Sequence, residues 1–279
     1  MSLDLVPIWT VILAVSVFMY VFLDGFDLGV GMLFPFAPDD ESRNLMMASV
    51  APVWDGNETW LVMGGIGIFA AFPTAFAIIF PALYFPVLAM LLGLIFRGVA
   101  FEFRASAITS RRHWDRAFFW GSLVATYAQG CVLGKFVLGF DVQGRQFAGS
   151  TLDWLHPFVL AVGVGLVFGY VLLGATWLVL KSEGELQRKA IGWAKWGLAW
   201  VALGVALVSL ATPLASETVR EKWFSFPLLV YLSPLPLATL VSGALLYINL
   251  GRSDWKPFAY AVAIFVLAFL GLASSLFPY

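Results

Sequence analysis

Eight long apolar stretches restrict the possible folds of this 279-residue chain more than any other feature of the sequence. Each stretch is close to the roughly 20 residues that an α-helix needs to cross the hydrocarbon core of a membrane. The stretches are continuous rather than alternating, so they predict helices and not the strands of a membrane barrel. They lie at about 7–34, 53–72, 75–100, 117–138, 157–180, 190–213, 226–249 and 257–278.

The composition agrees with a membrane environment. Hydrophobic residues make up 61% of the chain and charged residues 12%, which leaves too little polar surface to enclose one soluble globule. The net charge is −1 and there is no basic block, which argues against a nucleic-acid partner. The first apolar run has no cleavage-like end, so we expect a mature helix there rather than a signal peptide. The predicted fold class is an all-α polytopic membrane bundle.

The distribution of basic residues predicts the orientation of this bundle. Loops on the cytoplasmic side of a membrane protein carry an excess of Lys and Arg. With the N-terminus outside, twelve of the sixteen basic residues fall in inner loops, and four fall outside. We therefore expect about eight spans in two four-helix bundles, covering 1–140 and 141–279, with a cytoplasm-side cluster of acids and arginine in the first bundle.

Acidic residues in the first two spans are the candidates for chemistry, because charged groups are costly inside a membrane. Asp24 and Asp27 lie three residues apart near the inner end of the first span, and so on one face of the helix. In the second span the uninterrupted apolar part covers only residues 60–72, which is too short to cross a membrane. The crossing helix therefore has to include Asp55 and Glu58, which also share a face.

The third span adds a cation at the same depth. It reaches Arg97 at the inner side, with Glu102 and Arg104 one or two turns beyond. One interpretation is a proton-uptake path, or an ion site, that opens to the cytoplasm. The other is a structural ion pair of Arg97 with Asp24 or Asp27 that neutralises buried charge and fixes the helix register. The spacing leaves both interpretations open, and they can coexist.

Histidine and cysteine are scarce. His113 falls in a charged inner loop and His156 at the outer start of the fifth span, and no histidine lies in the middle of a span. A transmembrane haem held by two histidines is therefore not available within this chain. The single cysteine, Cys131, excludes an internal disulfide and a Cys-based metal site. We expect this chain to ligate neither haem nor metal, so that any haem chemistry takes place on a partner.

Five groups of motifs follow one another along the chain. They are Asp24-Gly25-Phe26-Asp27-Leu28-Gly29-Val30-Gly31, Trp54-Asp55-Gly56-Asn57-Glu58-Thr59-Trp60-Leu61, Phe96-Arg97-Gly98-Val99-Ala100-Phe101-Glu102-Phe103-Arg104, Trp114-Asp115 before Trp120-Gly121-Ser122, and Gly174-Ala175-Thr176-Trp177-Leu178 with Glu183-Gly184-Glu185-Leu186. In order and spacing they resemble the motifs of subunit II of cytochrome bd ubiquinol oxidases, and more closely those of its shorter, cyanide-insensitive branch.

The resemblance implies a place in a larger complex. In that family two quasi-symmetric subunits each contain two four-helix bundles and a further C-terminal helix. Subunit I ligates haems b558, b595 and d, or a haem b in place of d, and subunit II ligates none. The complex oxidises quinol, such as ubiquinol, and reduces O2 to water with protons from the cytoplasm. The resemblance thus implies a haem-bearing partner, surrounding lipid, the bacterial inner membrane and, in some members, a small accessory subunit.

The resemblance also implies roles for particular residues. Asp55 matches the acid at the cytoplasmic mouth of the proton path, Glu102 matches an acidic position further in, and Trp60 lies near the proposed oxygen entry. Asp27, Arg97 and Asp115 match positions that keep the haem-bearing subunit in working order. Glu58 joins the path by its spacing from Asp55 alone. Two departures are Ser106, where a lysine occurs in the family, and the end of the sequence at Tyr279, before the ninth helix. The sequence allows either a shortened relative or an incomplete chain.

Two other functions compete with the oxidase subunit. A proton-coupled secondary transporter or channel would use the inner carboxylates to bind its coupling ion. Such proteins have Gly- or Pro-broken helices at matching places in their two halves, and the proline pairs 81/86 and 234/236 come close to this pattern. A purely structural assembly subunit is the third possibility.

Overall fold

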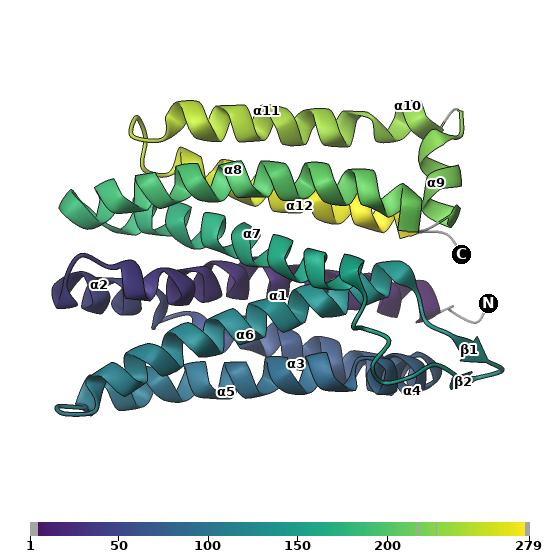
Figure 1. Cartoon of the computed structure of the whole chain (residues 1–279), viewed down its shortest axis with the longest axis horizontal. Helices are drawn as coiled ribbons and strands as arrows, with labels where there is room; N and C mark the ends of the chain where they lie inside the picture. Colours follow the sequence, from purple (N-terminus) through teal and green to yellow (C-terminus); the bar gives the residue numbers. More distant parts are fainter. Residues whose placement is uncertain (1–4, 216, 227, 277–279) are drawn as a thin grey trace.

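A computed structural model describes residues 5–215, 217–226 and 228–276, and these residues form a bundle of long helices along one axis (Figure 1). Strands β1 (Val142–Gln143) and β2 (Gln146–Phe147) make one antiparallel hairpin. The predicted all-α membrane fold is confirmed. We call the end of the bundle that carries this hairpin and α4 the hairpin end, and the opposite end, which carries α2, the α2 end. The predicted orientation would place the α2 end in the cytoplasm.

The helices in chain order are α1 (Leu5–Leu33), the short 3-10 helix η1 (Phe34–Phe36), α2 (Asp40–Val50), α3 (Trp54–Ala71), α4 (Pro73–Ala82), α5 (Tyr84–Ser106), α6 (Arg111–Leu138), α7 (Pro157–Lys181), α8 (Gly184–Ala215), α9 (Glu217–Phe224), α10 (Leu228–Leu232), α11 (Pro234–Asn249) and α12 (Lys256–Leu276).

Six segments of the described chain are long and apolar enough to cross a membrane. They are Leu5–Phe36, Tyr84–Ser106, Pro157–Lys181, Gly184–Leu214, Val230–Asn249 and Lys256–Ser275. Helices α3 and α6 match two further predicted spans but are not among the six. The multi-pass architecture is therefore established, whereas the count of eight spans, the outside N-terminus and the division into two four-helix bundles stay predictions.

Two predicted spans are not single helices. The span at 75–100 is broken at Leu83, between α4 and α5, and the span at 226–249 is divided between α10 and α11. Proline explains both breaks, because it has no N–H to donate and its ring collides with the carbonyl four residues earlier. Pro86 and Pro234 lie in the first turns of α5 and α11, where proline is tolerated. Both breaks lie toward the hairpin end (Figure 1).

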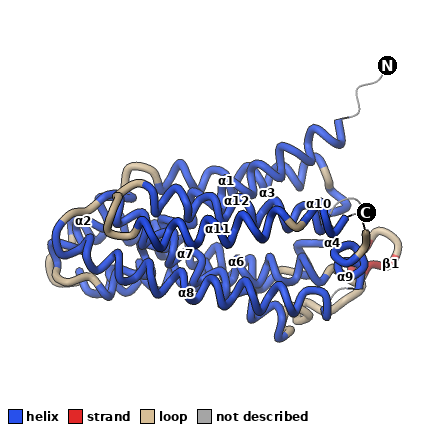
Figure 2. The backbone as a smooth tube through the Cα atoms, turned by 90° about the horizontal axis from the view of Figure 1, so that it is seen from above, coloured by secondary structure: helices blue, strands red, loops and turns tan. Residues whose placement is uncertain are grey.

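Helix α7 is the centre of the packing. It contacts α1, α6, α8 and α12, and in Figure 1 it separates α1 and α6 from α8 and α12. At its crossing with α1 the two backbones touch, because a Cβ added to Gly29 would collide with the Tyr170 carbonyl oxygen, and one added to Gly174 would collide with the backbone of Gly29. Small residues permit this close approach in membrane bundles. The view in Figure 2 shows the same long helices from above.

The segment after the first span contains a helix that the apolar pattern does not predict. Helix α2 has a low apolar content and begins at a capping residue, since the Asp39 carboxylate accepts a hydrogen bond from the Ser42 backbone N–H at 2.7 Å. This hydrogen bond also holds the pKa of Asp39 below its usual range. The buried Met46 and Val50 face the bundle, and the Trp177 indole nitrogen donates to Ser49 Oγ at 3.3 Å. Helix α2 thus closes the α2 end.

Candidate functional site

A buried arginine joins helices α1, α3 and α5. Arg97 Nη1 donates to Asp24 Oδ1 at 2.5 Å, and Arg97 Nη2 lies 3.9 Å from Asp27 Oδ2 and 3.6 Å from Glu58 Oε1. The side chains of Arg97, Asp24 and Asp27 have 0–1% of their surface exposed, and that of Glu58 has 24%. Together with Asn57, these residues are called the Arg97 cluster below.

Asn57 completes the cluster from α3. Its Nδ2 donates to Asp27 Oδ2 at 2.7 Å and to the Leu23 carbonyl oxygen at 3.3 Å. The Asp27 carboxylate therefore has an amide partner as well as Arg97. On the other side, Arg97 lies against Trp54 and Phe101, whose rings stack on each other 4.9 Å apart. The guanidinium is thus surrounded by three carboxylates and two aromatic rings, which fixes its position.

The Arg97 cluster lies deeper than the sequence predicts. Asp24 and Asp27 are not at the inner end of α1, because the helix continues to Leu33. Asp24 and Arg97 are each nine residues from the ends of α1 and α5, or about 13 Å at 1.5 Å per residue. Helix α3 begins only at Trp54, at the level of the cluster. The charges are therefore inside the bundle and not at its surface.

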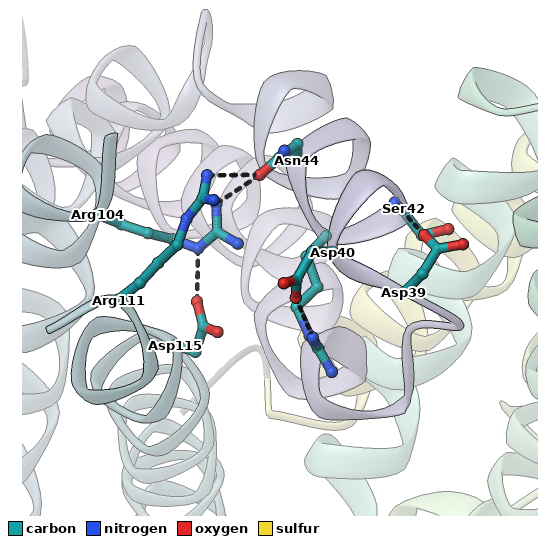
Figure 3. Close-up of polar contacts among 8 residues, drawn as sticks. Asp39, Asp40, Ser42, Asn44, Arg104, Arg111 and Asp115 are labelled. Carbon is teal, nitrogen blue, oxygen red and sulfur yellow. Dashed lines mark hydrogen bonds and ion pairs between the residues drawn. The ribbon is translucent and has the colours of Figure 1, made fainter. Parts of the chain in front are cut away.

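A second ion pair lies closer to the α2 end. Arg104 Nε donates to Asp115 Oδ1 at 2.5 Å, and Arg104 Nη1 donates to Asn44 Oδ1 at 2.9 Å (Figure 3). Arg111 donates to the same amide oxygen at 3.1 Å. Figure 3 shows that these side chains come from α5, α6 and α2. Arg104 also lies 5.0 Å from the centre of the Phe34 ring. This group joins α2 to the turn between α5 and α6.

The structure does not bring every candidate residue into the Arg97 cluster. Asp55 is exposed in the first turn of α3, three residues before the half-buried Glu58. Glu102 is exposed on α5, and five residues of helix place it about 140° around the axis from Arg97. Trp60 is half-buried on α3. Of the predicted site residues, the cluster brings together Asp27, Glu58 and Arg97, with Arg97 in contact with each of the two acids.

Two asparagines outside the predicted site residues contribute contacts. Asn57 contacts Asp27, and Asn44 accepts from two arginines. The signal for Asn57 is its spacing, because Trp54, Asn57 and Leu61 follow the i, i+3, i+7 pattern of an inward helix face. Asp55 falls outside that pattern. No comparable signal identifies Asn44, because its partners come from helices far away in the sequence.

The fold and the two ion pairs define a multi-pass membrane protein whose helices are joined by buried charged side chains. The chain belongs to the family of cytochrome bd terminal oxidase subunit II, whose model matches residues 5–279. This family places the chain in an oxidoreductase complex with a partner subunit, and it favours the oxidase interpretation over the transporter. Membership of the cyanide-insensitive branch stays a prediction.

Known relatives agree with the family. The chain is 31% identical to "Cytochrome bd-I ubiquinol oxidase subunit 2" of Escherichia coli (strain K12), with 98% of this chain and 80% of the relative covered. It is 31% identical to "Cytochrome bd ubiquinol oxidase subunit 2" of Bacillus subtilis (strain 168), with 80% of this chain and 68% of the relative covered.

A solved structure shares the fold. The structure of bd oxidase from Geobacillus thermodenitrificans superposes with a TM-score of 0.79 and covers 98% of this chain and 84% of that one. The identity is 17%, so this likeness concerns the arrangement of helices alone.

Proposed function

We propose that this chain is the haem-free second subunit of a quinol:oxygen oxidoreductase in the bacterial inner membrane. It supports a haem-bearing subunit I and contributes to proton uptake from the cytoplasm. The relatives named as ubiquinol oxidase subunits support quinol and O2 as the substrates of the complex. Haems b558, b595 and d, or b in place of d, would be held by subunit I, and ubiquinone is the expected quinone.

The positions of the histidines support the proposal that subunit I, and not this chain, holds the haems. His113 is exposed in the first turn of α6, and His156 precedes α7 and accepts a hydrogen bond from the Phe158 N–H. Because α6 and α7 are antiparallel neighbours, these two residues lie at opposite ends of the bundle and cannot ligate one haem. Within the described ranges, no group of three or more His, Cys, Asp or Glu could hold a metal ion. The separation of the two histidines supports the proposal that the haems are held by subunit I.

One contact carries the proton-uptake proposal. Glu58 Oε1 lies 3.6 Å from Arg97 Nη2, and Glu58 keeps 24% of its side chain exposed. Asp55 is exposed one turn before Glu58 on the same helix. Acids that follow one another at this spacing can pass protons inward, which isolated acids cannot. We propose entry at Asp55, transfer to Glu58 and a further acidic position at Glu102, with Trp60 near the oxygen entry.

The other charged residues would hold the subunit in its working shape. Arg97 and Asp27 join α5 to α1 and α3, and Asp115 fixes Arg104 at the α2 end. Removing one partner of a buried ion pair leaves an uncompensated charge, so these residues would control how much complex assembles. This assembly role and the proton-uptake role use different residues and can be tested separately.

Purification in mild detergent tests the proposed subunit role. We expect a stoichiometric haem-bearing partner, detected by the optical spectrum and by a pyridine haemochrome assay. Expressed alone, this chain should be colourless. A stoichiometric haem on the isolated chain would contradict the haem-free role, and purification of a colourless protein without a partner from its native membrane would contradict the oxidase role.

A further inference from the structure

Helices α1, α6 and α7 enclose a second set of polar side chains next to the Arg97 cluster. The set consists of Tyr20 on α1, Ser122, Thr126 and Gln129 on α6, and Tyr170 on α7, and each residue has at most 7% of its surface exposed. The two tyrosine hydroxyls, the serine and threonine hydroxyls and Gln129 Oε1 have no hydrogen-bond partner among the described residues. We call these five residues the inner polar site.

Other buried hydroxyls of the bundle are satisfied differently. Ser16 Oγ donates to the Ile12 carbonyl oxygen at 2.8 Å, and Thr176 Oγ1 donates to the Leu172 carbonyl oxygen at 2.9 Å. This bond to the carbonyl four residues earlier is the usual solution for a hydroxyl in a helix. Thr126 and Ser122 do not use it. The Thr126 hydroxyl is therefore available to a group between the helices, whereas Ser122 Oγ packs against Gly31.

The inner polar site lies against Asp24. A Cβ added to Gly25 would come within 2.7 Å of the Tyr170 ring, and one added to Gly31 would collide with Ser122 Oγ. Because α1 and α6 are antiparallel, the Gly31–Ser122 contact brings Gln129 to the level of Asp24. Tyr20 lies beside the Asp24 carboxylate and Tyr170 beside Gln129, each close enough for a weak side-chain hydrogen bond. Neither pair reaches full hydrogen-bond geometry, and among the described residues Asp24 Oδ2 has no other partner.

The incomplete hydrogen bonding of these groups favours a polar occupant. A buried donor or acceptor without a partner costs about 1–3 kcal/mol, and lipid supplies no hydrogen bonds to replace the missing ones. The site offers hydroxyls, which donate and accept, beside an amide oxygen and a carboxylate oxygen, which accept. Such a mixture suits a molecule with two donors and two acceptors, and buried water typically makes about three hydrogen bonds in sites of this kind.

We propose that the inner polar site binds water molecules that extend from Asp24 into the middle of the bundle. These waters would satisfy Tyr20, Thr126, Gln129 and Tyr170 and would hydrate the free oxygen of Asp24. The inference goes beyond the proposed proton entry at Asp55, because it concerns the opposite side of the Arg97 cluster and does not depend on turnover.

Hydroxyl-radical labelling by X-ray pulses tests this proposal on the assembled oxidase complex. Radicals form from water where it is bound, so that a buried side chain beside bound water takes up oxygen, and H2(18)O identifies its source by mass. We expect labelling of Tyr20 and Tyr170. Phe26 is the control, because it lies on α1 with the same 4% exposure as Tyr20 but packs on Trp177 and Phe258.

A double variant tests which residues hold the water. Thr126→Val and Gln129→Leu keep nearly the same volume and remove the polar atoms of α6, so labelling of Tyr20 and Tyr170 should fall to the level of Phe26. Two results would overturn the proposal: labelling of both tyrosines no higher than that of Phe26 in the unaltered complex, or labelling that persists in the double variant. The first comparison needs no substitution and holds even if the variant fails to assemble.

Discussion

Arg97 on α5 and Asp24 on α1 form a buried ion pair, with Nη1 and Oδ1 2.5 Å apart and 0–1% of each side chain exposed. The two residues are 73 positions apart in the sequence, so the pair joins helices that are not neighbours in the chain. Keeping such a pair adds little net stability, because both charges have lost their hydration. Breaking it is costly, because the remaining charge has no water to replace its partner.

Replacement of Arg97 should therefore damage assembly more than turnover. Arg97→Leu leaves Asp24 and Asp27 without their cation, and we expect a loss of about 3–5 kcal/mol in stability. Arg97→Lys should rescue only part of it, because an ammonium cannot reproduce the guanidinium geometry. The measurement is the yield of haem-loaded complex from membranes. Arg43→Leu is the control, because its pair with Asp40 is 27% and 71% exposed and should contribute about 0–1 kcal/mol. A normal yield from Arg97→Leu would refute the prediction.

The sequence was sufficient to predict the membrane fold and the meeting of three helices at one charged site. Runs of about 20 apolar residues determine helices in lipid almost by themselves, because every backbone group has to be satisfied within its own segment. Carboxylates and an arginine at similar depth then have one another as partners. The spacing left open which acid pairs with Arg97, and the structure selects Asp24, with Asp27 and Glu58 further away.

Other features are not contained in hydropathy. The break at Leu83 arises from Pro86 within an otherwise continuous apolar run, and the proline pair 81/86 indicates it where hydropathy alone does not. An amide in a membrane helix carries no charge, so the criterion of buried charge does not identify Asn57. The predicted position of Asp24 at the inner end of the first span was wrong, because the apolar run itself continues to residue 34 and α1 continues to Leu33.

Removal of the Asn57 amide should weaken the contact between α3 and α1. Asn57→Leu deletes the donor to Asp27 Oδ2 and leaves that oxygen buried, so we expect a loss of about 1–3 kcal/mol. This would appear as a lower unfolding temperature of the complex in detergent. Asn249→Leu is the matched control, because Asn249 donates only to the Leu245 carbonyl oxygen at an exposed helix end. Equal effects of the two variants would argue against a stabilising role for Asn57.

The crossing of α1 and α7 should not accept a methyl group. Gly29→Ala places a Cβ onto the Tyr170 carbonyl oxygen, so the helices must move apart. Overpacking of this kind costs about 1–3 kcal/mol or more. Gly56→Ala is a control in α3, where an added Cβ meets no atom within 4 Å and alanine favours the helix by up to about 1 kcal/mol. We expect the yield of folded complex to fall for Gly29→Ala only; equal yields would contradict the close crossing.

The Arg104–Asp115 pair should behave as one energetic unit. A double-mutant cycle with Arg104→Met and Asp115→Asn should give a coupling energy of about 0.5–3 kcal/mol in thermal unfolding of the complex. The haem content per assembled complex shows whether the Arg104–Asp115 pair stabilises only this chain or also supports the haem-bearing partner subunit. Loss of haem in the single variants would favour support, whereas additive effects with no coupling would show that the two side chains act independently.

The proton-uptake proposal rests on Asp55 and Glu58, so substitutions that keep their shape but cannot carry a proton provide its test. We expect Asp55→Asn to leave the haem spectrum intact and to slow oxygen consumption per haem by about tenfold or more, which corresponds to about 1.4 kcal/mol in the barrier. Asp55→Glu should recover part of the rate. Because Glu58 lies one turn away, it can substitute as the acid, and Asp55→Asn with Glu58→Gln should be slower than the two single effects predict.

Asp40→Asn, at an exposed acid on α2, is the control and should leave the rate unchanged. If Asp55 has only a structural role, Asp55→Asn will instead reduce the amount of complex and leave turnover per haem unaltered. An unaltered rate from a well-assembled double variant would remove both acids from the path.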